Sequence, residues 1–268
     1  MRATIETVEL PSTCTEIYRK GEGPTLVLIQ GGGTGKRAWY PIIDRIADRV
    51  HCLAFDNRGV GKGADIGDSL TIHDLAGDAA ELIEWLGEGP VHVAGVSLGG
   101  MIAMRLASER PDLVKTLTLH STTAKRNGRG QDAADFRMRI LDLGLPVDVL
   151  RRFVALWSEG AAGLTWNIPD DVVNTESFDR HNYEMQMEAA RGHHMSVEEL
   201  NRITSPTLIT VGSDDILTTP EDAKHLWRSI PGSRLIKVQG GGHGYYIDDP
   251  DLVAMLQAGW VAQHSHTP

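Results

Sequence analysis

Residues 95–100 of this chain read Gly95-Val96-Ser97-Leu98-Gly99-Gly100. The apolar run Val91-His92-Val93-Ala94 before them is typical of a buried strand, and residues 101–107 after them carry apolar side chains at helical spacing. A G-x-S-x-G sequence between a strand and a helix predicts a sharp turn that lifts the serine above the sheet edge. Small residues at Gly95 and Gly99 let the strand and the helix pass close together. The stretch therefore predicts a strand–turn–helix unit with Ser97 at its apex.

Ser97 is a candidate nucleophile. The first amides of the following helix have no acceptor within that helix, so they can stabilise an anion beside the serine hydroxyl. The alternative is a glycine-rich turn without a chemical role, because G-x-S-x-G alone also occurs by chance. Partners further along the chain favour the catalytic interpretation.

Strand and helix patterns alternate on both sides of this turn. Residues 5–20 alternate apolar and polar side chains, which predicts an antiparallel edge hairpin. Further strands are predicted at 25–29, 50–55, 91–94, 114–120, 206–212 and 234–238, and helices at 38–46, 71–86, 221–228 and 252–262. This alternation predicts a mostly parallel sheet with helices on both faces, in which ligands bind beyond the carboxyl ends of the strands.

Residues 124–204 interrupt the alternation. They contain several helix-like segments and no convincing strand. An excursion of this length between two strands is too long for a plain connection, so we expect it to have its own structure. The predicted division is a core domain, residues 1–123 and 205–268, with a helical lid, residues 124–204, inserted into it.

Composition limits the class of protein and its partners. A chain of 268 residues with 41% hydrophobic residues can bury one substantial α/β core. The net charge of -10 argues against nucleic acid or an anionic membrane surface as a partner. No apolar segment is long enough to span a membrane, no signal peptide is evident, and the two cysteines, Cys14 and Cys52, indicate no disulfide framework. We expect a soluble, cytoplasmic protein that binds a small molecule, and a homodimer is one arrangement that the sequence allows.

Two further features are interpreted as structural. The glycine-rich segment that follows Asp56 lacks the spacing of a phosphate-binding loop, so a turn is the preferred interpretation. Asp78, within the helix predicted at 71–86, is interpreted as a solvated or turn-bonding carboxylate rather than a catalytic one.

A serine hydroxyl needs a base to take its proton, and His243 is the best candidate. It follows a predicted strand and lies in Gly240-Gly241-Gly242-His243-Gly244, where backbone freedom can aim the ring at Ser97. The alternative is a loop histidine on the surface. The imidazole in turn needs an acceptor that fixes its tautomer, and Asp214 and Asp215 both follow the strand before it. Spacing alone does not choose between them.

The chain order of serine, acid and histidine resembles that of α/β-hydrolase-fold serine hydrolases. The resemblance covers nearly the whole chain outside the lid: Gln30-Gly31-Gly32, the turn from Phe55 to Gly61, the segment 95–100, Gly212-Ser213-Asp214-Asp215 with Pro220, and Gly242-His243. The group it resembles most is that of 3-oxoadipate enol-lactonases and small esterases. In this family the acid usually stands three residues after the glycine, which implies Asp215, with Asp214 as the alternative.

The same resemblance implies an oxyanion hole of two backbone N–H groups, those of Leu98 and Gly32. The chain departs from the family at two positions, with Gln30 where a histidine is usual and Gly63 where the turn usually closes with serine. A serine rather than an aspartate at position 97 argues against the dehalogenases and epoxide hydrolases of the family.

The lid and the oxyanion loop supply the remaining candidates for the substrate pocket. These are Gln30, Gly31, Phe153, Trp157, Trp166, Met185 and Met187. For the side chains from the lid, the alternative is a role in the lid's own core. Four arginines, Arg126, Arg129, Arg137 and Arg191, either bind a substrate carboxylate or are solvated. His193-His194 lacks accompanying ligands, so no metal and no cofactor is assigned.

Together these features predict hydrolysis of a small carboxylic ester or lactone through an acyl-enzyme. Ser97 attacks, His243 acts as base and then as acid, and Asp215 orients the ring of His243. The alternatives are a carbon–carbon bond hydrolase, an aminopeptidase or an acyl transferase with the same triad, and a non-catalytic ligand-binding protein on this scaffold.

Overall fold

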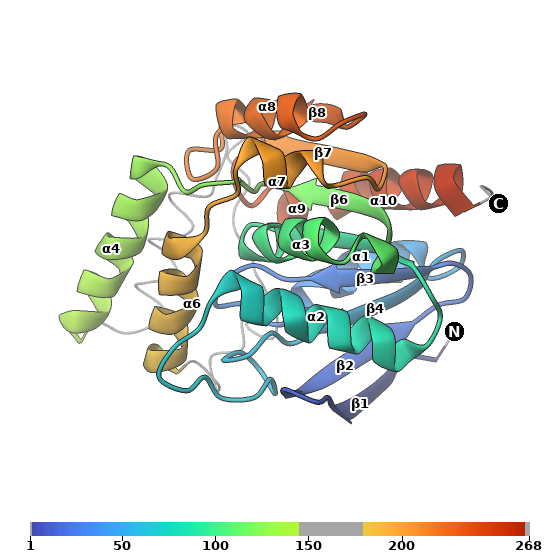
Figure 1. The fold of residues 1–268 in the computed structure, drawn as a ribbon, viewed down its shortest axis with the longest axis horizontal. Coiled ribbons are helices and arrows are strands. Elements are labelled where there is room, and N and C mark those ends of the chain that lie inside the picture. Colours follow the sequence, from blue (N-terminus) through green and yellow to red (C-terminus); the bar gives the residue numbers. More distant parts are fainter. Residues whose placement is uncertain (1, 145–178, 266–268) are drawn as a thin grey trace.

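A computed structural model describes residues 2–144 and 179–265 of the chain. At its centre lies an eight-stranded sheet with the order β1-β2-β4-β3-β5-β6-β7-β8 (Figure 1). The strands are β1 (Thr4–Glu9), β2 (Cys14–Lys20), β3 (Thr25–Ile29), β4 (His51–Phe55), β5 (Val91–Val96), β6 (Val114–His120), β7 (Thr207–Gly212) and β8 (Arg234–Val238). β1 pairs antiparallel with β2, and β2 pairs antiparallel with β4. The other neighbouring strands pair in parallel. The predicted α/β sheet is confirmed.

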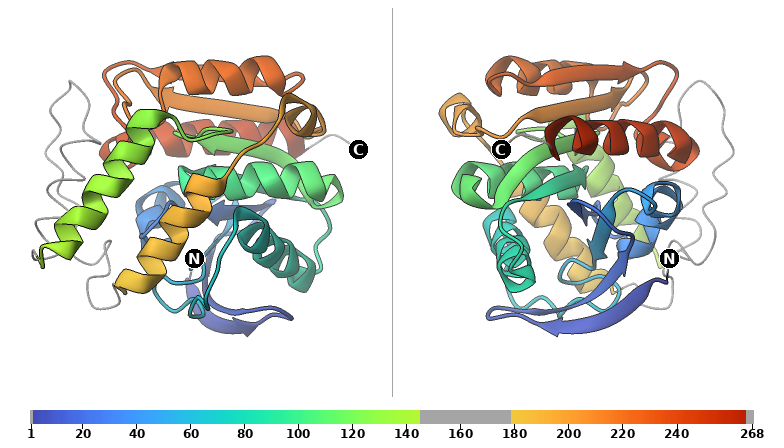
Figure 2. Two further views of the ribbon diagram at one scale, coloured as in Figure 1. Left: turned by 60° about the vertical axis from the view of Figure 1, so that its left-hand side comes forward. Right: turned by 90° about the vertical axis from the view of Figure 1, so that its right-hand side faces the viewer.

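Helices cover both faces of the sheet (Figure 2). They are η1 (Lys36–Trp39), α1 (Tyr40–Ile46), α2 (Ile72–Leu86), α3 (Leu98–Glu109), η2 (Pro111–Leu113), α4 (Gly128–Asp142), α6 (Arg180–Gly192), α7 (Val197–Asn201), α8 (Pro220–Ser229), α9 (Tyr245–Asp248) and α10 (Pro250–Ser265). Val27 of β3 belongs to the core cluster that includes residues of α2, α3 and α8, whereas the adjacent Leu26 and Leu28 belong to the cluster that includes residues of α1 and α10. Alternate side chains of a strand point to opposite faces, so a strand covered on both faces is apolar throughout.

The turn after β4 is built around the carboxylate of Asp56. This carboxylate accepts hydrogen bonds from the backbone N–H of Lys36 at 2.8 Å, from its Nζ at 2.6 Å and from the N–H of Lys62 at 3.0 Å. A Cβ on Gly61 would lie 2.3 Å from an Asp56 carboxylate oxygen. The glycines therefore wrap a buried carboxylate, which supports a structural turn rather than a phosphate site.

Asp78 on α2 is buried rather than solvated. Its two carboxylate oxygens accept hydrogen bonds from Arg58 Nε at 2.7 Å and Nη2 at 2.6 Å, and Ser12 donates a third at 3.0 Å. Arg58 belongs to the turn after β4, so this pair fastens that turn to α2. The sequence pattern did not indicate the partner because Arg58 lies twenty residues earlier.

The described part of the predicted lid contains α4, α6 and α7, and its only strand-like pairing is the isolated bridge between Lys125 and His194. α4 and α6 lie side by side at one end of the strands (Figures 1 and 2). Asn127 begins α4 by accepting the Gly130 N–H at 2.8 Å, and it donates to Asp222 at 2.8 Å, which ties this end of α4 to α8. Phe153, Trp157 and Trp166 lie outside the described residues.

Both cysteines are free. Cys52 is fully buried in β4, and burial raises the pKa of its thiol to about 12. Within residues 2–144 and 179–265, no helix has the length and apolar character needed to cross a membrane.

Candidate active site

Ser97 lies at the junction of β5 and α3 in a strained backbone conformation. Its φ is 54° and its ψ is -117°, values that side-chain-bearing residues seldom adopt. The turn is tight: a Cβ on Gly95 would lie 2.2 Å from the Gly99 carbonyl oxygen, and one on Gly99 would lie 2.2 Å from that of Ile29. The glycine requirement of the G-x-S-x-G pattern is therefore steric at both positions.

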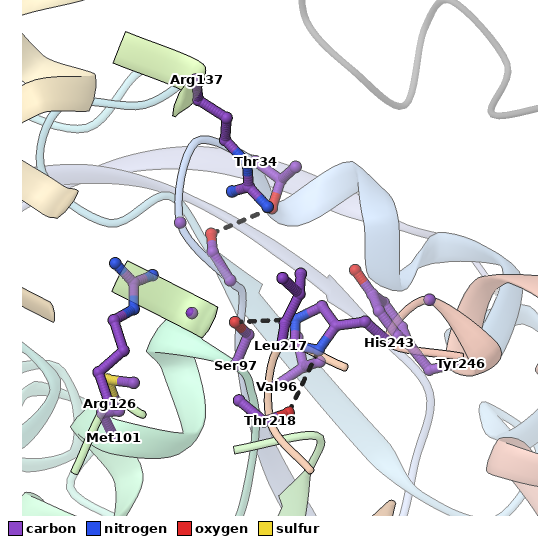
Figure 3. A pocket seen from close by; sticks show the side chains of 14 residues that line it. Thr34, Val96, Ser97, Met101, Arg126, Arg137, Leu217, Thr218, His243 and Tyr246 are labelled. Carbon is purple, nitrogen blue, oxygen red and sulfur yellow. Dashed lines mark hydrogen bonds between the residues drawn. The ribbon is translucent and has the colours of Figure 1, made fainter. Parts of the chain in front are cut away.

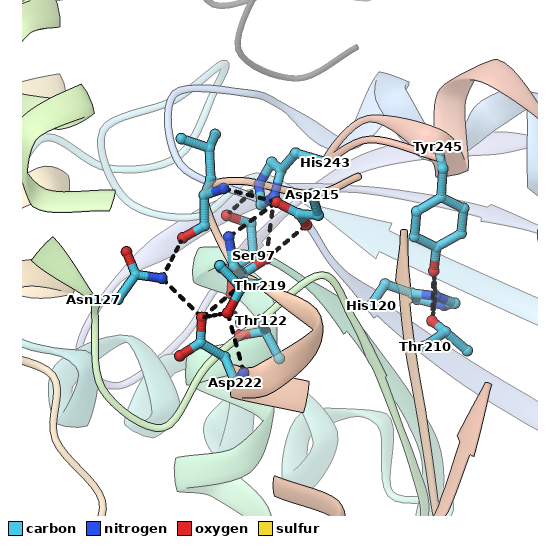
Figure 4. A network of polar contacts seen from close by, with 12 residues as sticks. Ser97, His120, Thr122, Asn127, Thr210, Asp215, Thr219, Asp222, His243 and Tyr245 are labelled. Carbon is cyan, nitrogen blue, oxygen red and sulfur yellow. Dashed lines mark hydrogen bonds and ion pairs between the residues drawn. The ribbon is translucent and has the colours of Figure 1, made fainter. Parts of the chain in front are cut away.

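A chain of hydrogen bonds joins Ser97 to two residues from the other end of the sheet (Figure 4). The ring of His243, in the loop after β8, places Nε2 3.1 Å from Ser97 Oγ and Nδ1 2.9 Å from Asp215 Oδ2. β5, β7 and β8 run parallel, so the segments that follow their carboxyl ends meet at one edge of the sheet.

Asp215, and not Asp214, contacts the histidine. The Asp214 carboxylate accepts the hydroxyl of Ser213 at 2.7 Å instead. The backbone N–H groups of Leu217 and Thr218 donate to Asp215 Oδ1 at 2.9 and 3.0 Å, and the Thr218 hydroxyl donates to Oδ2 at 2.8 Å.

These contacts outweigh the effect of burial on Asp215. Burial acts to raise the pKa of its carboxyl, but the charge of His243 and the hydrogen bonds from His243 and Thr218 bring it below the ordinary value. An ionised carboxylate at Nδ1 holds the proton on that nitrogen, so the lone pair of Nε2 faces Ser97. The arrangement can therefore accept the hydroxyl proton.

The loop after β3 lies beside this serine. A Cβ on Gly31 would lie 3.4 Å from the Cβ of Ser97, and one on Gly32 would lie 3.8 Å from the Cβ of Leu98. Leu98 is the first residue of α3, so its N–H has no acceptor within the helix. In the described part of the chain the Gly32 N–H has no acceptor either. Two unpaired backbone donors thus lie next to the Ser97 hydroxyl.

Two anchors hold this loop in place. Gln30 is fully buried behind the loop, where its side-chain NH₂ donates to the Tyr246 hydroxyl at 3.1 Å and its backbone carbonyl accepts a hydrogen bond from the Asn57 side-chain NH₂ at 3.1 Å. On the other side, the Gly33 N–H donates to Gln186 of α6 at 2.8 Å. Gln30 is thus an anchor of the loop and not a pocket-lining residue.

Gly63, the second departure from the family pattern, also has a steric reason. A Cβ at this position would lie 2.3 Å from the Asn57 carbonyl oxygen. The turn of this chain therefore closes without room for the usual serine side chain.

The pocket in front of Ser97 joins core and lid segments (Figure 3). It is lined by Gly31, Gly32, Thr34, Val96, Ser97, Met101, Arg126, Gly130, Arg137, Leu217, Thr218, His243, Gly244 and Tyr246. Met185, expected here, packs instead against the core cluster that contains the residues of α3. Met187 lies against Gly32 in the loop after β3. Trp157 and Trp166 lie outside the described residues.

Sequence reasoning missed three residues that shape this site. Thr218 and Tyr246 follow Asp215 and His243 by three positions each, which is a usable signal because segments after strand ends fold back on the site. Gln186 offers no such signal, since α6 is distant in sequence from the loop it contacts. Within the described residues, no group of three or more histidine, cysteine or acidic side chains is arranged to hold a metal ion.

A second polar cluster lies in the core behind this site (Figure 4). Nδ1 of the buried His120 is 2.7 Å from the Thr210 hydroxyl and 2.8 Å from that of Tyr245, and Nε2 is 2.6 Å from the Gln257 side-chain nitrogen. Burial lowers the pKa of His120 to about 3. This histidine is therefore neutral and serves to join β6, β7, α9 and α10.

Comparisons with known proteins agree with this architecture. A family model described as alpha/beta hydrolase fold matches residues 24–250. The (E)-2-((N-methylformamido)methylene)succinate hydrolase of Acinetobacter baylyi is 26% identical over 260 residues, covering 96% of this chain and 97% of its own length.

Solved structures resemble the fold over almost the whole chain. MGS-M2, an alpha/beta hydrolase enzyme from a Medee basin deep-sea metagenome library, superposes with a TM-score of 0.87 at 19% identity, covering 96% of this chain and 98% of its own. A thermophilic esterase from Thermogutta terrifontis superposes with a TM-score of 0.80 at 21% identity, covering 98% and 100%. At these identities the likeness concerns the fold.

Proposed function

The chain belongs to the α/β-hydrolase-fold family and is a hydrolase, and on that premise we propose that it cleaves a small carboxylic ester or lactone through an acyl-enzyme on Ser97. The observation that carries the proposal is the continuous hydrogen-bond path from Ser97 through His243 to Asp215. It lies beside two unpaired backbone N–H groups, those of Gly32 and Leu98, in a pocket that a small molecule can enter.

The proposed reaction follows from this geometry. Ser97 Oγ attacks the carbonyl carbon while its proton passes to His243 Nε2 over the 3.1 Å contact. The carbonyl oxygen becomes an oxyanion that accepts hydrogen bonds from Gly32 and Leu98. The carbon–oxygen bond to the leaving group then breaks, and the departing alkoxide takes the proton from His243. Water, deprotonated by His243, attacks the acyl-enzyme and releases the acid and free Ser97.

Asp215 has an electrostatic role in this scheme. Its low pKa keeps the carboxylate ionised at neutral pH, so it stabilises the imidazolium that forms when His243 takes the proton. Thr218 supports this role because its hydroxyl donates to the same carboxylate oxygen at 2.8 Å.

Amide hydrolysis by the same residues is the second candidate. The Acinetobacter baylyi relative is named for a substrate with a formamido group, in which an acyl carbon is bonded to nitrogen. His243 would then protonate a leaving nitrogen rather than an alkoxide, with the other steps unchanged.

One experiment tests the proposal and separates these candidates. Hydrolysis of short-chain aryl esters, a lactone and an anilide is followed with wild type and Ser97→Ala, together with intact mass after treatment with a sulfonyl fluoride. Ser121→Ala is the matched control. Ser121 also follows the end of a buried strand and has a positive φ, of 42°, but it does not line the pocket. We expect activity and adduct in wild type and Ser121→Ala and neither in Ser97→Ala.

Unchanged turnover by a folded Ser97→Ala would contradict the proposal. Ligand binding without turnover or adduct in wild type would favour a non-catalytic binding protein, and product formation that depends on an added alcohol would favour an acyl transferase.

A further inference from the structure

Two arginines line the pocket opposite the catalytic histidine. Arg126 precedes α4 and Arg137 lies within it, and both face the pocket that holds Ser97 (Figure 3). In that view Arg126 lies on the side of Ser97 away from His243. Both side chains are half-buried.

Neither of these arginines has an acidic partner among the described residues. Arg126 Nη2 lies 3.9 Å from the sulfur of Met187, and Arg137 Nη1 donates to the Tyr183 hydroxyl at 3.3 Å. Within the described part of the chain, Arg126 Nη1 and Arg137 Nε are buried and have no hydrogen-bond partner. A buried charge with orphaned donors is unfavourable unless something else compensates it.

The other arginines of the same region behave differently. Arg191 pairs with Asp135 and approaches Glu188 at 3.6 Å, and Arg129 on α4 is exposed to solvent. Of these four arginines, only the two that face the pocket are both partly buried and without an acidic partner among the described residues.

Arg126 carries a positive charge at neutral pH. Burial, and then the charge of Arg137, lower the pKa of Arg126 to about 10, which still leaves it protonated at pH 7. The pocket therefore gathers arginine side chains in a chain whose net charge is -10.

We propose that the substrate carries a free carboxylate and that Arg126 and Arg137 bind it while Ser97 attacks a separate carbonyl group of the same molecule. This inference rests on the proposed function. A planar carboxylate can accept two parallel N–H bonds from one guanidinium, which would satisfy the donors that are orphaned in the free protein. The substrate class is a half-ester, or an acidic lactone or amide, of a short dicarboxylic acid.

Substrate pairs test the charge requirement directly. The methyl half-ester of succinic acid is compared with a neutral methyl ester in which a methyl group replaces the free carboxylate. We expect wild type to favour the half-ester in kcat/KM, and Arg126→Gln and Arg137→Gln each to lower that value roughly 10- to 100-fold, the range for a lost hydrogen bond to a charged group.

The neutral ester and a matched variant serve as controls. The two glutamine variants should lower kcat/KM less for the neutral ester than for the half-ester, so the ratio of the two values should fall relative to wild type. Arg129→Gln removes a charge from the same helix without touching the pocket, so it should leave both substrates unaffected. A wild type that favours the neutral ester, or glutamine variants that lower both substrates equally, would overturn the inference.

Binding without turnover separates this inference from the proposed function. Succinate should raise the melting temperature of wild type and of Ser97→Ala, whereas dimethyl succinate and inorganic phosphate should raise neither. This result stands even where an arginine variant fails to fold. Ester turnover through Ser97 without stabilisation by succinate would refute the carboxylate site and leave the function intact. Stabilisation by succinate without turnover or adduct would do the reverse.

Discussion

Gln186 accepts the backbone N–H of Gly33 at 2.8 Å, so a side chain of α6 fixes the loop that carries the Gly32 donor. The same side chain donates to the carbonyl oxygen of Arg58 at 2.6 Å and thereby joins that loop to the turn after β4. Helix α6 thus holds the loop whose Gly32 N–H we propose as an oxyanion donor.

Gln186→Met should lower kcat about tenfold or more with a smaller change in KM, because methionine keeps the volume but loses the bond to Gly33. Hydrogen bonds from these donors stabilise the neutral carbonyl oxygen of the bound substrate less than they stabilise the oxyanion. Steady-state kinetics on an aryl ester measure this. Glu188→Gln, two positions away on the exposed side of α6, is the control. Equal kinetics for wild type and the methionine variant would show that the loop keeps its conformation without this hydrogen bond.

The two adjacent aspartates should differ sharply in their effect on activity. Asp215→Asn leaves the shape of the site but removes the charge that fixes the tautomer of His243, so kcat should fall by about 10³- to 10⁴-fold. Asp214→Asn keeps an acceptor for the Ser213 hydroxyl and should remain within about threefold of wild type. Comparable losses in both variants would mean that the assignment of the acid to Asp215 is wrong.

Alanine should have opposite effects at two helical glycines. Gly99→Ala places a Cβ 2.2 Å from the Ile29 carbonyl oxygen. We therefore expect the free energy of unfolding to fall by about 3 kcal/mol or more, or the variant to fail to fold. Gly259 in α10 has nothing within 4 Å of a built Cβ, and its replacement by alanine should stabilise by up to about 1 kcal/mol. Urea unfolding compares the two. A stable Gly99→Ala would contradict the tight crossing of α3 over β3.

Stability should fall as the pH drops from about 6.5 towards 4, because several histidines are buried in the neutral form. Burial lowers the pKa of His92 to about 4 and those of His120 and His193 to about 3. The unfolded chain, with histidine pKa values near 6.5, binds more protons than the folded one in this window, so acid favours unfolding. Each histidine contributes a slope of about 1.4 kcal/mol per pH unit.

His120→Gln tests this sign. The variant is expected to be less stable than wild type at about pH 7, since it loses contacts with Thr210 and Tyr245, but its stability should depend less steeply on pH down to about pH 5. Urea unfolding at intervals across this range measures both slopes. Parallel curves for the two proteins would mean that folding does not lower the pKa of His120.

The architecture could be predicted from sequence because each strand and helix carries a local signal. The apolar run of β3 indicates a strand covered on both faces, and Thr71 with Asp74 forms the capping box that starts α2. The contact of Asp215 with His243 could not be derived from spacing alone. The choice between the two aspartates depends on which carboxylate the segment at Leu217 folds around, and this is known only from the folded loop.

Long-range partners were beyond the reach of sequence patterns. Arg129 and Arg137 lie on one helix and look alike in the sequence, yet only Arg137 faces the pocket, because the packing of α4 against α6 sets the orientation of the helix. Gln186 contacts Gly33 across 153 positions, and no periodicity records such a pair.

The order of strands in the sheet also bears on how activity appears during biosynthesis. Ser97 follows β5, but His243 and Asp215, its proposed base and acid, follow β8 and β7, the last two strands of the sheet to be synthesised. On the proposed mechanism, a nascent chain that has completed the turn at Ser97 therefore lacks the base and the acid that would activate this serine. In refolding, recovery of turnover should report the docking of β8, the final edge strand, and should lag behind recovery of helical circular dichroism.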